Sequence, residues 1–134
     1  MATFESLTIF YPMWNEEATI ERAVVAGFEA GDRLVASGEV ERYDVLIVDD
    51  ASTDATAAIA DAMAAADDRV SVVHHPSNRK LGGALKTGFA NATGELILYT
   101  DADLPFDMVE VDKAVRLMRI YEADIVSAYR FDRT

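Results

Sequence analysis

The sequence predicts an α/β fold in which a mainly parallel sheet carries helices on both faces. Short apolar runs alternate along the chain with longer amphipathic stretches, and this alternation favours a parallel sheet. Two of the runs, 45–48 and 96–99, are continuously apolar, as strands covered on both sides should be. The chain has 134 residues, of which 51% are hydrophobic, and these can form one domain over residues 1–134 with its own core.

The first half of the chain predicts two strands and two helices. Residues 7–11 and 43–48 are short apolar runs of strand length. Residues 17 to about 35 repeat apolar side chains every three or four positions, as one face of a helix does. Residues 55–66 are rich in alanine and show the same spacing, so they predict the second helix.

The second half repeats this pattern. Residues 70–74 and 96–99 predict the third and fourth strands, and residues 81–92 predict the helix between them. Residues 107–122 predict the fourth helix, because Asp107 and Glu110 have the spacing of a capping box. Residues 125–128 predict a fifth strand. Right-handed crossovers between parallel strands leave few topologies for this order.

Composition excludes several classes of function. The chain carries 24 Asp and Glu against 12 Lys and Arg, a net charge of -12, so we expect no nucleic-acid partner. It has no cysteine, which excludes disulfides, thiolate zinc sites and thiol nucleophiles. No run of about 18 apolar residues is present, and the start lacks a basic segment. We therefore expect a cytoplasmic domain, with any attachment to the cytoplasmic face of a membrane made by a segment missing from this chain.

Polar residues follow the predicted strands at the points where they end. In a parallel sheet these positions share one edge, and ligands bind there. The candidate residues are Trp14-Asn15-Glu16 after the first strand, Asp49 to Asp54 after the second, 75–80 after the third, Asp101-Ala102-Asp103 after the fourth and Arg130 after the fifth.

Asp101 and Asp103 form an Asp-x-Asp pattern. Two neighbouring carboxylates repel each other unless a cation lies between them, and Mg²⁺ or Mn²⁺ bound by carboxylates and substrate phosphates removes that repulsion. An acidic turn before the next helix is the structural alternative. Asp49 and Asp50 follow a buried strand and favour contact with a ligand, whereas Asp54 fits helix capping and ligand contact equally well.

The segment 78–88 opens a helix with glycines and three basic residues, Arg79, Lys80 and Lys86, which suit a phosphate. It lacks the Lys and Ser/Thr of a P-loop, and Gly88 fits close helix packing. Trp14 and Glu16 could place an aromatic ring and a carboxylate beside a nucleobase. In the structural alternative the segment is the start of a helix, with Asn15 as its N-cap. His74 and His75 have no metal-ligand partner at helical spacing and are interpreted as structural.

Together these segments resemble inverting family 2 glycosyltransferases with the Rossmann-like GT-A fold. The resemblance is carried by residues 9–17, 47–54, 78–89, 92–95 and 99–104, in the expected order. Within the family the chain is most similar to polyprenyl-phosphate (dolichol-phosphate) sugar synthases. The resemblance implies a metal-dependent transfer of a sugar from a UDP- or GDP-sugar to an acceptor such as a polyprenyl phosphate or a glycan.

The resemblance also implies roles for individual residues. The nucleoside pocket would be lined by Pro12, Trp14 and Glu16, with Asp50 on the base and Asp49 supporting it. Lys86 and Ala102 would also belong to the nucleotide-sugar-binding residues, and Arg130 would lie near the diphosphate or the acceptor phosphate. Asp103 would be the principal metal ligand and Asp101 would assist it while contacting the ribose or diphosphate. The chain departs from the family pattern at four places. Trp14 stands where Tyr is usual, and Lys80 stands where Gly is common. Pro105 stands where the polyprenyl-phosphate synthases often have a metal-binding Gln, and residues 127–130 replace the usual Gly-Ser-Arg.

The chain is short for the family, so the resemblance covers only the donor-binding half. The acceptor-binding half and the general base are expected to lie outside it, and no catalytic residue is assigned. We therefore expect nucleotide-sugar binding with little or no transfer by this chain alone. The alternative function is a non-catalytic binding or assembly module that needs a partner chain or a homo-oligomer. A sugar-phosphate nucleotidyltransferase is disfavoured, because 12–17 lack glycine and basic residues.

Overall fold

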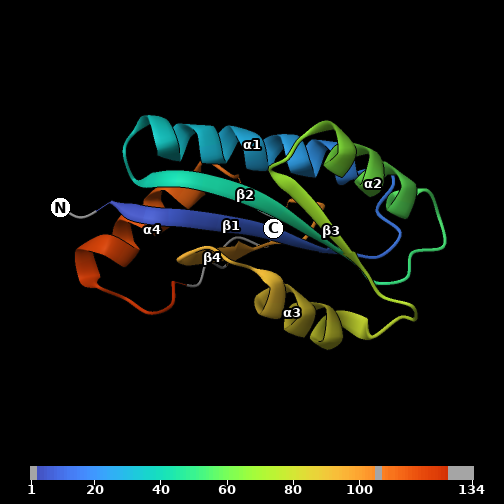
Figure 1. The fold of residues 1–134 in the computed structure, drawn as a ribbon. Coiled ribbons are helices and arrows are strands. Elements are labelled where there is room, and N and C mark those ends of the chain that lie inside the picture. The colour runs from blue at the N-terminus through green and yellow to red at the C-terminus, as the bar shows by residue number, and fades with distance from the viewer. Residues whose placement is uncertain (1–2, 105–106, 127–134) are drawn as a thin grey trace, which may run out of the picture.

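The computed structural model describes residues 3–104 and 107–126, which form strands alternating with helices (Figure 1). The strands are β1 (Phe4–Met13), β2 (Val40–Asp49), β3 (Val70–His74) and β4 (Leu96–Tyr99). The helices are α1 (Ile20–Ala36), α2 (Thr56–Ala66), α3 (Lys80–Asn91) and α4 (Glu110–Tyr121). The predicted α/β class and the order of these elements are confirmed.

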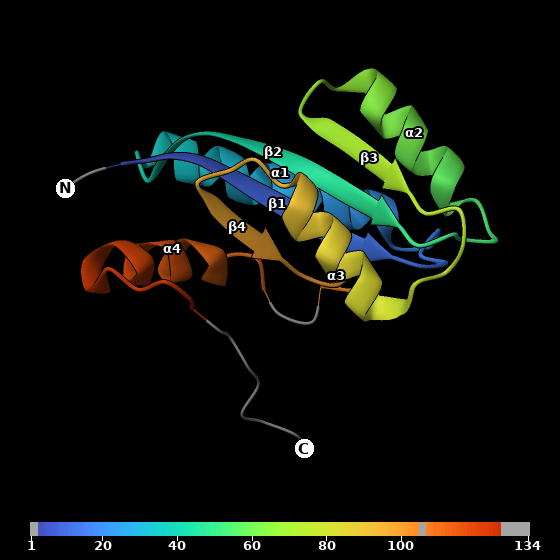
Figure 2. The same cartoon turned by 60° about the horizontal axis from the view of Figure 1, so that its bottom comes forward.

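The four strands form one parallel sheet in the order β3-β2-β1-β4. Strand β1 is therefore central and pairs with β2 on one side and with β4 on the other. Because all neighbours are parallel, the strands end at the same edge of the sheet, where they lead into the loops that precede the helices (Figure 2). This edge is where the sequence places its polar residues.

Both faces of the sheet are covered, which explains the continuously apolar strands. On one face, alternate residues such as Ile9 and Tyr11 pack in a core that includes residues of α1, α2 and α4. On the other face, Phe10, Leu46 and Val48 pack with Ala84 of α3. Figure 1 shows α1 and α2 on the opposite side of the sheet from α3. The period of two in β1 thus divides its side chains between two cores.

Helix α3 lies unusually close to the sheet at Gly88. A Cβ atom added there would come within 2.1 Å of the Phe10 ring, a distance that real Cβ contacts essentially never show. Gly88 is therefore required for packing, as interpreted from the sequence. The Phe10 ring also makes an edge-to-face contact with Phe89, at 5.3 Å between centroids.

Some predicted boundaries are wrong. Helix α1 begins at Ile20 because Thr19 N and Ile20 N both donate to the Glu16 carbonyl in a preceding turn. The predicted capping box does not form, since the Asp107 carboxylate accepts a hydrogen bond from Val109 N and α4 begins at Glu110.

The predicted fifth strand is not seen where it can be checked. Ile125 and Val126 have no strand structure, and residues 127–128 lie outside the described residues. Within the described ranges, no helix is both long and apolar enough to cross a bilayer.

Candidate functional site

Backbone hydrogen bonds carry the parallel pairing past the strand ends and bring the loops together. Asp50 N donates to Met13 O at 2.9 Å, and His75 N donates to Asp49 O at 2.9 Å. On the other side of β1, Thr100 N donates to Phe10 O at 3.3 Å. The loops after all four strands therefore start side by side, as predicted from the topology.

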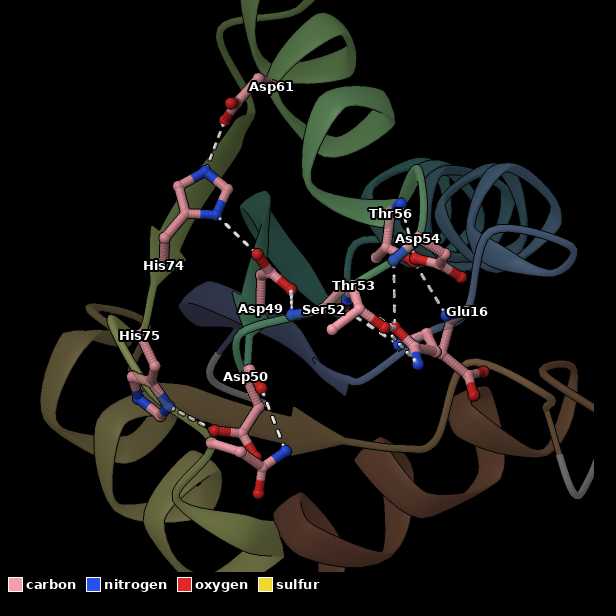
Figure 3. Close-up of polar contacts among 12 residues, drawn as sticks. Glu16, Asp49, Asp50, Ser52, Thr53, Asp54, Thr56, Asp61, His74 and His75 are labelled. Atoms are coloured by element: carbon pink, nitrogen blue, oxygen red, sulfur yellow. Dashed lines mark hydrogen bonds and ion pairs between the residues drawn. The ribbon is translucent and has the colours of Figure 1, made fainter.

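The loop after β1 is hydrogen-bonded to the loop after β2 (Figure 3). Asn15 N donates to Ser52 Oγ at 3.0 Å, and the Asn15 side-chain oxygen accepts from Thr53 N at 2.8 Å. Figure 3 labels Ser52 and Thr53 in the loop after β2 and Glu16 in the loop after β1. Glu16 N donates to the Thr56 hydroxyl at 2.8 Å. Asn15 thus fixes one loop against another, and the N-cap role considered for it is wrong, because Thr19 precedes α1.

Asp54 belongs to this structural network. Its Oδ1 accepts a hydrogen bond from Thr56 N at 2.9 Å, and its Oδ2 accepts one from Glu17 N at 3.3 Å. Desolvation opposes ionisation, but the hydrogen bonds from Thr56 and Glu17 outweigh it and lower the pKa of Asp54. Of the two equal interpretations, capping of the first turn of α2 is the one that the contacts support.

Asp49 is buried at the end of β2 and shapes the same loop. Its Oδ1 accepts from Ser52 N at 3.1 Å, and its Oδ2 lies 2.8 Å from His74 Nδ1. Burial pushes the pKa of Asp49 upward, but the hydrogen bonds from Ser52 and His74 outweigh burial and leave the pKa below its ordinary value. Asp49 is therefore an ionised support for the loop that carries Asp50.

His74 joins three elements through two carboxylates. Its Nδ1 faces Asp49 of β2, and its Nε2 lies 2.7 Å from Asp61 Oδ1 of α2 (Figure 3). Ionised carboxylates only accept, so both ring nitrogens donate and the imidazolium form is favoured. The hydrogen bond with Asp49, followed by that with Asp61, raises the pKa of His74. The sequence interpretation of His74 as structural agrees with this geometry, although its partners were not foreseen.

Asp50 is buried and holds the loop between β3 and α3. Its Oδ1 accepts from Arg79 N at 2.7 Å and lies 2.7 Å from His75 Nδ1. The Asn78 side-chain amide donates to the Asp50 carbonyl at 3.1 Å. The strand register that places Asp49 opposite His74 also places Asp50 beside His75. The sequence shows Asp49-Asp50 and His74-His75 as adjacent pairs at the ends of two strands, but only the register matches each His to its Asp.

A depression of about 270 Å³ lies beside Asp50. It is lined by Trp14, Asp50, Asn78, Lys80 and Leu81. Trp14 is 52% exposed as a residue, so its indole is open to stacking. An aromatic face beside a carboxylate and an amide suits a planar, hydrogen-bonding heterocycle. The structure thus brings together two of the predicted nucleoside contacts, Trp14 and Asp50.

The other predicted contacts are placed differently. Pro12 is buried in β1 opposite Val48, and the Glu16 carboxylate accepts a hydrogen bond from the Thr19 hydroxyl at 3.0 Å. Lys86 lines a separate depression of about 640 Å³ on α3, together with Arg79 and Thr87. Arg130 lies outside the described residues. Asp50, Trp14 and Lys80 therefore line one depression, and Lys86 lines the other.

Asp101 and Asp103 are both exposed, and Ala102 between them is buried in the main core. A turn closes this segment, with Leu104 N donating to Asp101 O at 3.1 Å. Neither carboxylate forms a hydrogen bond or ion pair with another described residue. Two such carboxylates suit a hard divalent cation, with phosphate and water as further ligands. No cluster of three or more acidic or histidine side chains that could hold a metal occurs in the described ranges.

A non-glycine residue with a positive φ follows each strand, either in the loop or, for Lys80, at the first position of the next helix. These residues are Asn15 (53°), Ala51 (61°), Lys80 (64°) and Leu104 (53°). This backbone region costs an L-residue other than Asn or Asp roughly 1–2 kcal/mol. Lys80 therefore has a backbone conformation that would suit glycine, the residue common at this position in the family that the sequence resembles. Strain of this kind concentrates at functional sites.

Comparisons with known proteins agree on one family. The model of the family described as "Glycosyl transferase family 2" matches residues 8–134. The glycosyltransferase AglD of Haloferax volcanii is 31% identical over 125 residues, which are 93% of this chain and 20% of that protein. The undecaprenyl-phosphate 4-deoxy-4-formamido-L-arabinose transferase of Sodalis glossinidius is 30% identical over 131 residues, 96% of this chain and 38% of that protein.

Solved structures agree on the GT-A glycosyltransferase fold. The mannosyltransferase PcManGT from Pyrobaculum calidifontis, in complex with GDP-Man and Mn²⁺, superimposes with a TM-score of 0.67 at 26% identity. The match covers 87% of this chain and 33% of that one. The chain thus spans between a fifth and two fifths of the proteins compared here.

Proposed function

Because this chain belongs to glycosyl transferase family 2, we propose that it binds a nucleoside-diphosphate sugar at the carboxyl edge of its sheet. The observation that carries the proposal is the depression between Trp14 and Asp50, at the edge where β4 leads to the exposed Asp101 and Asp103. An aromatic face and a carboxylate suit the base, and a carboxylate pair suits a cation that holds a diphosphate. The chain would form the donor side of an inverting sugar transfer.

Each residue then has a part in holding the donor. Trp14 stacks on the base and Asp50 accepts from a base N–H, while Asp49 keeps the Asp50 loop in place through Ser52. Pro12 and Glu16 support the loop that carries Trp14. Asp103, assisted by Asp101, holds Mg²⁺ or Mn²⁺, and Ala102 anchors the pair in the core.

The charge of the donor requires compensation in so acidic a chain. When bound, the divalent ion neutralises charge on the leaving nucleoside diphosphate. Arg79, Lys80 and Lys86 of the α3 region form no ion pair with other described residues, so their charge remains available to phosphate. Lys86 and Arg130 are proposed to serve the diphosphate or the acceptor phosphate.

The donor and acceptor classes are proposed by analogy with the relatives. PcManGT was solved with GDP-Man and Mn²⁺, which makes GDP the first nucleotide to test and UDP the second. The relative from Sodalis glossinidius is named for undecaprenyl phosphate, so a polyprenyl phosphate is the proposed acceptor. Transfer also needs a general base on the acceptor, which we assign to no residue of this chain.

Titration calorimetry tests the donor site. We expect GDP or UDP to bind the wild-type chain with Mn²⁺ at least about ten-fold more tightly than without it, a difference of about 1.4 kcal/mol. Asp103→Ala should remove this metal-dependent gain, because a principal ligand is lost. Asp68→Ala is the matched control: it removes one exposed carboxylate from the turn between α2 and β3, at the opposite edge of the sheet, and should change nothing.

Two results would count against this assignment. Metal-dependent binding that survives Asp103→Ala would contradict the metal site. Absence of binding of either nucleotide by the wild-type chain, together with a stable dimer in sedimentation, would favour the alternative of a non-catalytic assembly module.

A further inference from the structure

His75 lies between Asp50 and Thr87 and has no part in the donor site proposed above. It is 6% exposed as a residue, with Nδ1 at 2.7 Å from Asp50 Oδ1 and Nε2 at 2.7 Å from Thr87 Oγ1. Asp50 follows β2, His75 follows β3, and Thr87 comes from the middle of α3. A continuous hydrogen-bonded chain therefore runs from Thr87 of α3 through His75 to Asp50, the candidate base contact. Figure 3 shows the part of this chain between His75 and Asp50.

The Asp50 carboxylate fixes the direction of its hydrogen bond with His75. An ionised Asp50 carboxylate only accepts, so His75 Nδ1 carries a proton and donates it. In a neutral ring Nε2 is then the acceptor, and the Thr87 hydroxyl donates to it. Asp50 thus sets the tautomer, and the contact of Thr87 with Nε2 holds the plane of the ring.

The same contacts decide which Asp50 oxygen meets a ligand. Oδ1 is occupied by two donors, His75 Nδ1 and Arg79 N. Oδ2 has no hydrogen-bond partner among the described residues, and Asp50 lines the depression beside Trp14. With Oδ1 held by two donors, rotation of the carboxylate is restricted and Oδ2 is the oxygen left for a ligand.

We propose that His75, oriented by Thr87, is a positioning residue that fixes the Asp50 carboxylate for recognition of the nucleobase. This inference rests on the proposed function, because it requires that a nucleotide binds beside Asp50. It assigns His75 no contact with the nucleotide. His75 would act on Asp50 through one atom, Nδ1. Amide side chains that replace either Nδ1 or Nε2 can therefore test the proposal.

Two substitutions separate the two ring nitrogens. In His75→Asn the amide nitrogen can take the place of Nδ1 and keep the donor to Asp50. In His75→Gln the longer side chain reaches the place of Nε2 and keeps only the contact with Thr87. Loss of a hydrogen bond to a charged group costs about ten-fold in affinity. Calorimetry with Mn²⁺ should therefore show that His75→Gln weakens GDP or UDP binding about ten-fold, whereas His75→Asn stays within about three-fold of wild type.

Binding of Mn²⁺-pyrophosphate distinguishes positioning of Asp50 from a merely structural role. A structural role would change the affinities for nucleotide and pyrophosphate together. Because pyrophosphate has no base, its affinity should be equal in wild type and in His75→Gln. A parallel loss of pyrophosphate and nucleotide binding would overturn the proposal and indicate general damage to the fold. Equal nucleotide affinity in the Asn and Gln variants would also overturn it, while leaving the proposed function intact.

Thr87 provides a second variant in case His75→Gln folds poorly. Thr87→Val removes the hydroxyl at nearly constant shape and should weaken nucleotide binding about three-fold, whereas Thr87→Ser should keep it. Equal affinity in the Val and Ser variants would contradict the part assigned to Thr87. If the wild-type chain binds pyrophosphate with Mn²⁺ but neither nucleotide, the base site itself is wrong and the proposal falls with it.

Discussion

Two adjacent histidines differ in their surroundings. The His74 side chain is 39% exposed and lies between Asp49 and Asp61, whereas the His75 side chain is 2% exposed and lies between one carboxylate and a hydroxyl. The hydrogen bonds with Asp49 and Asp61 raise the pKa of His74 and favour the charged ring, which links β2, β3 and α2. Since Asp49 also accepts from Ser52 N, this contact helps to hold the loop that carries Asp50.

The contact of His74 with Asp49 predicts a pH dependence of stability. The raised pKa of His74 means that its contribution is fully present below its ordinary value of 6.5 and is lost as pH rises through the folded-state pKa. The lowered pKa of Asp49 acts in the opposite direction: its contribution is present above 3.8 and is lost as pH falls through the folded-state pKa. The contact should therefore contribute most between about pH 4 and 6.5.

Urea unfolding of wild type and His74→Gln at pH 5.5 and pH 9 measures this contribution. The variant should be less stable than wild type at pH 5.5, and the difference should shrink at pH 9. Solvent screening of the partly exposed ring limits the pH-dependent part to about 1 kcal/mol or less. Asp61→Asn, which removes only the exposed partner, should show a smaller effect of the same sign. A difference that grows from pH 5.5 to pH 9 would contradict the charged assignment.

At the scale of elements, α3 brings Thr87 and the basic residues to the site. Its distance from the sheet is set by Gly88, whose absent side chain leaves room for the Phe10 ring. A shift of α3 would move Thr87 away from His75. The packing of Gly88 on Phe10 and the hydrogen bond between Thr87 and His75 therefore depend on one another.

Two alanine substitutions in α3 test this packing. Gly88→Ala should destabilise the protein by about 1–3 kcal/mol, because the new methyl group overlaps Phe10. Gly82→Ala is the matched control: nothing lies within 4 Å of its added Cβ, so it should stabilise the helix by about 0.5–1 kcal/mol. Urea unfolding measures both, and equal effects of the two substitutions would contradict the close packing of α3.

The element order could be predicted from the sequence because apolar spacing reports local burial. The ends of the elements could not be predicted, because they depend on contacts with other segments. Strand β1 extends from Phe4 to Met13 because β2 pairs with it over that length. The capping box failed for a similar reason, as Asp107 accepts from Val109 N. Polar residues at one edge followed from topology alone, whereas the pairs of His74 and His75 with Asp49 and Asp50 required the β2–β3 register.

At the scale of the whole molecule, charge and the proposed ligand are in conflict. A chain with a net charge of -12 would repel a nucleoside diphosphate, and the exposed Asp101 and Asp103 add to that repulsion at the sheet edge. A divalent cation between the carboxylates and the diphosphate resolves the conflict. The acidic composition is therefore consistent with a donor site only if binding is linked to metal.

The position of the metal is the central claim, and amide NMR of the ¹⁵N-labelled chain with GDP or UDP and substoichiometric Mn²⁺ tests it most directly. Paramagnetic broadening should appear first at the amides of 101–104 and extend to those near Asp50, while Mg²⁺ in excess should restore the signals. Broadening centred on the acidic residues Glu17 and Asp54, or on the turn at Asp67 and Asp68, with 101–104 unaffected, would contradict the claim.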